Sequence, residues 1–159
     1  MWGQSCHKVG HTISALLLTS AVYVSGSLPI VSASGPSSTS LTVRVNGFRS
    51  QNGQLCLSLY SKAKGFPSSR SGAIQAQCLE TGTPTITFPN LHSGSYAVAV
   101  FHDANSDGTL NRNPIGIPTE GFGFSRNPRI LTGPPAFSDS AVFIAGPGQN
   151  IDIELNYML

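Results

Sequence analysis

Residues 86–101 read Ile-Thr-Phe-Pro-Asn-Leu-His-Ser-Gly-Ser-Tyr-Ala-Val-Ala-Val-Phe and predict two strands joined at a corner. Ile86 and Phe88 alternate with threonine, which is the period-two pattern of a strand with one buried face. A Gly-containing turn follows, and Tyr96 then opens a second strand with its hydroxyl placed to bond back to the preceding corner. Such corners are structural, so we interpret Tyr96 as stabilising the fold rather than catalytic, and His92 of the same turn as solvated.

Outward from this stretch, short runs of alternating apolar and polar residues predict five more strands. These runs are 41–45, 55–59, 73–79, 141–144 and 151–157. The pair Asn52-Gly53 is a strong turn signal, so the first two of these strands are expected to form a hairpin. The segment 96–101 is apolar on both faces, as expected of a strand in the middle of a sheet. The whole pattern predicts an all-β protein built as a seven-stranded antiparallel β-sandwich.

The composition favours the same fold class. Only 10% of the 159 residues are charged, and the chain contains 17 Gly and 11 Pro. Few Glu and Lys side chains and frequent Gly and Pro disfavour amphipathic helices. The formal net charge is +2 and no basic cluster is present, so we expect no nucleic-acid partner.

The first 33 residues have the pattern of an export signal that is removed from the mature protein. An apolar stretch over 13–24 precedes Val31-Ser32-Ala33, which places small residues where a signal peptidase cleaves. The alternative is a retained membrane anchor, but Ser25-Gly26 interrupts the stretch before the roughly 20 residues of a spanning helix. The expected division is a signal peptide over 1–33, a linker over 34–40 and a β-sandwich domain over 41–159. We expect a periplasmic or extracellular protein that has no membrane attachment once the signal is cleaved.

Two cysteines, Cys56 and Cys78, follow the leader. In an oxidising compartment two cysteines are more often paired than free, and the loop they would close is worth roughly 3 kcal/mol in chain entropy. The pattern argues partly against a bridge. Leu55 and Leu57 look inward and place Cys56 on the opposite face, whereas Ile74 and its apolar neighbours place Cys78 on the inward face. The pair remains a disulfide candidate with both outcomes open.

Between His102 and Ser138 the sequence predicts neither strand nor helix. A connection of this length is usually functional or disordered. Its many apolar residues disfavour a solvated tether, so we expect one long Gly/Pro-rich loop that folds against the sandwich and presents a binding surface. The candidate residues of that surface are His102, Phe122, Phe124 and Ser125.

The start of this loop, Asp103-Ala104-Asn105-Ser106-Asp107-Gly108-Thr109-Leu110-Asn111, has the spacing of a calcium loop. Pro114 occupies the twelfth position, where a bidentate Glu would close the shell, so affinity should be weak, roughly 10⁻⁴ to 10⁻³ M, unless Glu120 folds back. The alternative is an ordinary Asp/Asn/Gly turn held by side-chain to backbone hydrogen bonds. The candidate Ca²⁺ ligands are Asp103, Asn105, Asp107, Thr109, Asn111 and Glu120, and no other cofactor is expected.

Ordered motifs run through the second half of the chain. They are Gly94–Asp103, Asn105, Asp107-Gly108, Leu110-Asn111, Gly116–Ser125 and Gly133–Phe137. With these motifs the chain resembles, from about Leu41 to Tyr157, the exported bacterial Domain of Unknown Function family 2141. The resemblance implies an immunoglobulin-like or transthyretin-like sandwich and export, and it implies no particular activity. Asn111 stands where an Asp is commoner in the family, and the cysteines are not part of the family pattern.

Three functions remain open on the sequence. The expected one is a non-enzymatic exported module whose loop binds calcium weakly and presents a surface to a ligand or partner, such as a saccharide or an envelope component. A hydrolase using His102, Glu120 and Ser125 is the second, although the sequence has no nucleophile-elbow motif and no metal motif with His ligands. The third is an envelope structural or interaction protein without an ion, for which the three Phe residues of the loop would form an exposed patch.

Overall fold

The computed structural model describes residues 38–82 and 85–159 of the chain. The predicted signal peptide, 1–33, lies outside these residues, as does most of the predicted linker. The strands are β1 (Thr39–Asn46), β2 (Gln54–Tyr60), β3 (Gln75–Glu80), β4 (Thr85–Leu91), β5 (Gly94–Asp103), β6 (Gly121–Phe124), β7 (Val142–Ile144) and β8 (Gln149–Glu154). The helical elements are a 3₁₀ turn, η1 (Arg70–Gly72), and a four-residue helix, α1 (Phe137–Ser140). β1 begins at Thr39, so it includes the last two residues of the predicted linker.

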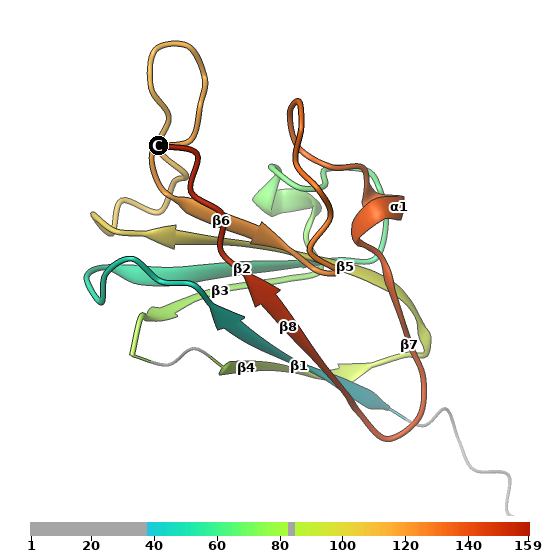
Figure 1. Cartoon of the computed structure of the whole chain (residues 1–159). Helices are drawn as coiled ribbons and strands as arrows, with labels where there is room; N and C mark the ends of the chain where they lie inside the picture. The colour runs from blue at the N-terminus through green and yellow to red at the C-terminus, as the bar shows by residue number, and fades with distance from the viewer. Residues whose placement is uncertain (1–37, 83–84) are drawn as a thin grey trace, which may run out of the picture. The chain divides into compact units, whose positions relative to one another are not determined.

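The strands form two sheets that face each other across a common core (Figure 1). One sheet has the order β4-β1-β8 and the other β3-β2-β5-β6, with β7 pairing the start of β5. The predicted all-β class with almost no helix is confirmed. None of the helical segments in the described part of the chain has the length and apolar character needed to cross a bilayer.

The prediction that every strand pair is antiparallel is wrong. β1 and β8 run parallel, with Val43 opposite Ile151. Antiparallel neighbours can be joined by a tight turn, whereas parallel neighbours need a long connection. β1 and β8 are separated by all the other strands of the domain, so no turn constrains their relative direction.

The predicted hairpin of the first two strands is also wrong, because β1 and β2 lie in different sheets. β1 pairs with β4 and β8, whereas β2 pairs with β3 and β5. The connecting residues, 47–53, cross from one sheet to the other, and Phe48 packs against the core on the way. Asn52-Gly53 does form a turn, with Gly53 at a φ of +78°. Alternation of apolar residues identified the buried face of both strands correctly but carried no information about their neighbours.

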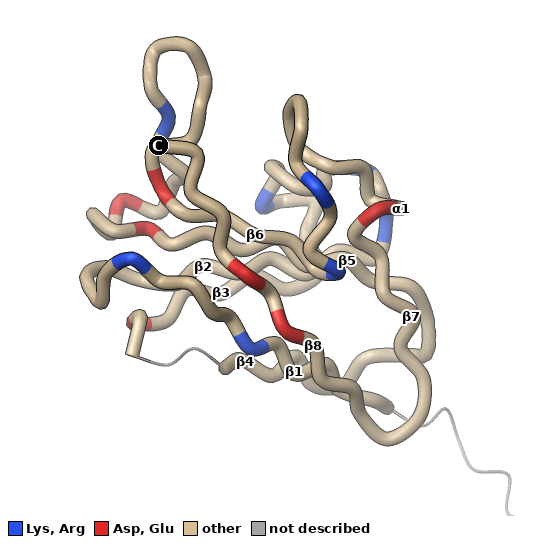
Figure 2. Tube along the Cα trace, viewed as in Figure 1, with Lys and Arg blue, Asp and Glu red and all other residues tan. Residues whose placement is uncertain are grey.

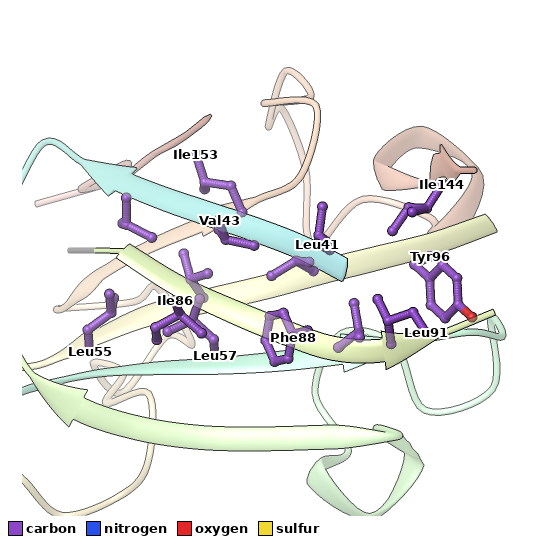
Figure 3. Packing of buried hydrophobic residues seen from close by; sticks show 14 of the residues in the cluster. Leu41, Val43, Leu55, Leu57, Ile86, Phe88, Leu91, Tyr96, Ile144 and Ile153 are labelled. Carbon is purple, nitrogen blue, oxygen red and sulfur yellow. The ribbon is translucent and has the colours of Figure 1, made fainter. Parts of the chain in front are cut away.

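The core consists of the alternate residues of both sheets that point toward each other (Figure 3). Its members include Leu41, Val43, Val45, Leu55, Leu57, Leu59, Ile86, Phe88, Leu91, Tyr96, Val98, Val100, Ile144, Ile153 and Leu155. Fully burying one such aliphatic or aromatic side chain contributes about 1.5–3 kcal/mol, so this cluster is the main source of stability.

The tyrosine corner predicted at Tyr96 is present. The Tyr96 hydroxyl donates a hydrogen bond to the carbonyl oxygen of His92 at 2.9 Å, while the His92 side chain is exposed. This bond fixes the turn at which the chain leaves β4 in one sheet and enters β5 in the other.

The expectation that 102–138 contains no strand is wrong, because β6 forms there and pairs with β5. Its sequence is Gly-Phe-Gly-Phe, with Phe122 and Phe124 opposite the outward residues Phe101 and Ala99. The glycines face inward, where the C-terminal segment passes closely. A Cβ atom at Gly123 would lie only 2.7 Å from Ile153 Cγ2, and one at Gly121 2.4 Å from Tyr157 Cζ. Glycine is required at these positions, and it also weakens the strand signal in the sequence.

Candidate functional site

The sheet β3-β2-β5-β6 carries a cavity of about 690 Å³ on its outer face, the face turned away from the core. The floor of this outer-face cavity is built from outward residues of three neighbouring strands. They are Cys56 and Ser58 of β2, Ala99 and Phe101 of β5, and Phe122 and Phe124 of β6. Ala99 lies at the centre, since it pairs with Ser58 on one side and Phe124 on the other.

Loops rise above the sheet (Figure 1). Residues of these loops form the walls of the cavity. One wall comes from 108–118, a second from 130–134 and a third from the segment that follows Pro67. Ile115 and Leu131 line the cavity near the tips of the first two loops and are 80% and 74% exposed. Exposed apolar side chains that gather at one place are typical of an interaction site.

Two of the three walls are held by hydrogen bonds. In the first, the Asn113 side-chain oxygen accepts hydrogen bonds from the backbone N–H groups of Ile115 at 3.2 Å and Ile117 at 2.9 Å. The backbone of 111–119 closes on itself through an Arg112–Pro118 bridge. In the third, the Tyr60 hydroxyl donates to the Pro67 carbonyl oxygen at 2.9 Å, and burial raises the pKa of this phenol. These contacts order two walls of the cavity through the protein's own hydrogen bonds.

A disulfide between Cys56 and Cys78 forms part of the cavity floor. The expectation that the two sulfurs point to opposite faces is wrong, because β2 and β3 place Cys56 directly opposite Cys78. Gln77 pairs with Leu57 and so shares the inward face. β3 is the edge strand of its sheet and all its inward residues stay partly exposed, which is why glutamines stand where inward apolar residues were expected.

The charged residues among those that line the cavity are basic. Arg70 and Arg112 are among its lining residues, which include no Asp or Glu. Figure 2 shows Lys and Arg on the loops above the outer face, with acidic residues on β8, on α1 and on the loops as well.

The sequence-predicted binding surface is only half present. Phe122 and Phe124 lie in the cavity floor and are 6% and 7% exposed. His102 and Ser125 are buried outside the cavity. Ser125 Oγ accepts from the Val98 backbone N–H at 2.9 Å and donates to the Ser140 carbonyl oxygen, which are structural bonds at the end of β6.

His102 belongs to a separate buried network. Its Nε2 lies 2.8 Å from the carbonyl oxygen of Asn52, which can only accept, so Nε2 carries the proton. Its Nδ1 then accepts from the Tyr157 hydroxyl at 3.1 Å. The imidazole thus ties the 47–53 crossing and the C-terminal segment to β5.

The three hydrolase candidates are not brought together. His102 pairs with Gly121 at the start of β6, whereas Ser125 follows its end, about 13 Å further along the strand. Glu120 accepts hydrogen bonds from the backbone N–H groups of Ala104 and Asn111, each at 2.9 Å. Each side chain is engaged in a different place.

The predicted calcium loop forms a compact turn, with Gly108 at a φ of +80°. The buried Asp103 carboxylate accepts from the N–H of Gly108 at 2.7 Å, the N–H of Asp107 at 3.1 Å and the Gln54 side chain at 2.7 Å. Glu120 does fold back onto the loop, through the bonds to Ala104 and Asn111 given above. Within 38–82 and 85–159, no group of three or more His, Cys, Asp or Glu residues is arranged to hold a metal.

Asp107 is the centre of the exposed half of this turn. Its carboxylate accepts from the Thr109 hydroxyl at 2.7 Å and from the side-chain amides of Asn111 and Asn105 at 3.0 and 2.9 Å. The Thr109 hydroxyl, followed by the amides of Asn111 and Asn105, holds the pKa of Asp107 well below its usual range. The other side-chain atom of Asn111, Oδ1, is buried without a hydrogen-bond partner among the described residues.

Sequence reasoning missed most of the cavity. The floor residues Ala99 and Phe101 belong to the stretch that is apolar on both faces, which by itself predicts only a central strand. The outward apolar residues of such a strand need a cover, and here the loops provide it. That double-sided pattern was the signal available.

The chain has no match among the curated proteins and none among the solved structures compared with it. A family model does match it over residues 43–152, from β1 into β8, and therefore over most of the core, the turn at 103–111 and the three walls of the cavity. That family is described as an uncharacterized protein conserved in bacteria, and it is the one that the motifs resemble. The chain belongs to this bacterial family, DUF2141.

Proposed function

We propose that the protein is an exported, non-enzymatic binding module that holds a small apolar ligand in the outer-face cavity. The observation that carries the proposal is the cavity itself. Its volume of about 690 Å³ lies within the range of small-molecule sites, roughly 300–1,000 Å³, and its floor is largely apolar. An apolar envelope component suits this lining better than a saccharide, which needs many polar partners.

Export rests on the predicted signal peptide, and the Cys56–Cys78 disulfide supports it, since disulfides persist in oxidising compartments. The two facing sheets and the tyrosine corner support an immunoglobulin-like or transthyretin-like sandwich as the fold type. Phe122 and Phe124 are nearly buried and Phe137 is half-buried, which favours a ligand-binding module over a protein that presents an apolar patch.

The proposal is tested by NMR titration of the protein with octanol, a small neutral apolar probe. We expect saturable shifts of the backbone amides of Ala99, Phe122 and Phe124, and a negative heat-capacity change by calorimetry. Amides of β4 and β8, in the other sheet, serve as the internal control. Shifts that fail to saturate, or that spread equally over both sheets, would contradict the proposal.

Weak calcium binding by the turn at 103–111 is the second candidate function. The buried Asn111 Oδ1, which has no hydrogen-bond partner among residues 38–82 and 85–159, favours it, because a buried acceptor without a donor is costly and a cation would satisfy it. Asp103, Asn105, Asp107, the Thr109 backbone carbonyl, Asn111 and Glu120 are the residues that would hold the ion. To bind, Asp107 must exchange its hydrogen bonds from Thr109, Asn105 and Asn111 for coordination, which is consistent with weak affinity.

Calcium binding predicts that the melting temperature of the protein rises in millimolar calcium relative to chelator. At a calcium concentration ten times Kd, binding raises the free energy of unfolding by about 1.4 kcal/mol. The Asp107→Asn variant should lose the rise, and magnesium should give less of it because magnesium demands a stricter octahedral shell. Equal melting temperatures in calcium and chelator would leave the turn as a hydrogen-bonded Asx structure.

A further inference from the structure

We propose that the ligand of the outer-face cavity is a single-chain anion, an apolar chain that ends in a carboxylate or a similar negative group. This inference rests on the proposed function and specifies the ligand class. The observation behind it is the lining of the cavity, which includes Arg70 and Arg112 and no Asp or Glu.

Both guanidinium groups are available to a ligand. Arg112 Nη1 donates to the Gly116 carbonyl oxygen at 2.9 Å, and Arg70 Nη1 makes a long contact of 3.8 Å with Cys78 Sγ. A guanidinium has five N–H donors, so most remain unused in these contacts. The one ion pair within 38–82 and 85–159 is Arg44–Asp152 at 3.4 Å, in the other sheet. Neither cavity arginine therefore has a carboxylate partner in the described part of the chain.

The two arginines belong to different walls of the cavity. Arg112 belongs to the 108–118 wall and is held by the bridge to Pro118. Arg70 starts η1, whose preceding residue Ser69 is bonded through its carbonyl oxygen to the Tyr60 hydroxyl at 3.3 Å. An apolar chain can thus lie on Ala99 and the phenylalanines of the floor with its charged end toward an arginine.

The energetics favour an anion over neutral and cationic ligands of the same size. A ligand that fills the cavity removes water from the arginine side chains, and an anion replaces that water with charge-assisted, bidentate hydrogen bonds. A neutral ligand replaces that water with weaker hydrogen bonds, and a cationic ligand is repelled by the positively charged arginines. A cavity of about 690 Å³ has room for one chain, and the charged group of that chain can bind at an arginine of the lining.

The test compares three probes with the same eight-carbon chain on the full protein: octanoate, octanol and octyltrimethylammonium. We expect octanoate to bind at least about tenfold more tightly than octanol, which corresponds to about 1.4 kcal/mol, and the cation to bind most weakly. Added salt should reduce the advantage of octanoate, because the arginines are exposed.

The double variant Arg70→Gln/Arg112→Gln should lose the advantage of octanoate and keep the affinity for octanol. Arg44→Gln, which removes a positive charge from the other sheet, is the matched control and should keep the advantage. Equal binding of octanoate and octanol by the wild-type protein would overturn this inference and leave the proposed function intact. An octanoate preference that survives in the double variant would also overturn it. If none of the probes binds, the proposed function itself fails.

Discussion

Replacing Gly53 by alanine is expected to lower the free energy of unfolding by about 4 kcal/mol, a large share of the 5–15 kcal/mol of a typical domain. Gly53 has a φ of +78°, and a left-handed conformation costs an L-residue about 1–2 kcal/mol. In addition, a Cβ at this position would lie 2.1 Å from the Asp103 carbonyl oxygen and 2.7 Å from the Cα of Ala104. Because these are backbone atoms, the clash can be removed only if the end of β5 moves away from β2.

Urea unfolding with the disulfide intact measures this effect. Gly133→Ala is the matched control, since Gly133 has a similar φ of +73° but open space where the Cβ would stand. The free energy of unfolding of this control should fall only by the conformational cost of a left-handed alanine, about 1–2 kcal/mol. Because Gln54 donates to the Asp103 carboxylate across the same contact, Gly53→Ala should also disturb the amides of 103–108. An equal fall in the free energy of unfolding for the two variants would show that Gly53 is not in close contact with the backbone of Asp103 and Ala104.

The sequence predicted which residues face the core far better than which strands are neighbours. Alternation identified the inward face of β1 and β2 because burial acts on each residue separately. Pairing depends on the path of the chain between strands, and the turn signal at Asn52-Gly53 occurs in a crossing between sheets as readily as in a hairpin. The tyrosine corner was predictable because its hydrogen bond, from Tyr96 to His92, is local.

β6 escaped prediction for a specific steric reason. Its inward positions must be glycine so that the C-terminal segment can pass at Gly121 and Gly123. Backbone hydrogen bonds join Phe122 and Asn156 in both directions, at 3.0 and 2.7 Å, so this passage also ties β6 to the C-terminal segment. A strand whose inward residues lack side chains shows no apolar alternation in the usual sense. Because β6 forms part of the cavity floor, the cavity could not be predicted from the sequence without this strand.

The apolar residues of the predicted loop surface lie in the observed cavity, whereas its polar residues do not. Phe122 and Phe124 are in the floor, whereas His102 and Ser125 stabilise buried crossings. Polar residues beside a functional loop satisfy backbone groups more often than they meet a ligand. The arginines of the walls went unnoticed because their common position depends on the folding of two distant loops.

Filling the cavity from its centre should abolish octanol binding, and Ala99→Trp is the variant that does so. Ala99 is half-buried, lines the cavity and sits between Ser58 and Phe124 in the sheet, so an indole there occupies the space of the ligand. The side chain points away from the core, and the free energy of unfolding should change by less than about 1 kcal/mol. The measurement is the NMR titration with octanol beside a urea unfolding curve.

Ser95→Trp provides the control, because Ser95 lies on the same strand and the same face as Ala99 but is exposed and outside the cavity lining. It should bind octanol like the wild-type protein. If Ala99→Trp proves unstable, Ser58→Trp fills the same space from β2, since Ser58 pairs directly with Ala99 and also lines the cavity. Undiminished binding by a folded variant of this kind would place the ligand elsewhere, because a cavity whose centre is occupied by an indole has no room left for an apolar chain along its floor.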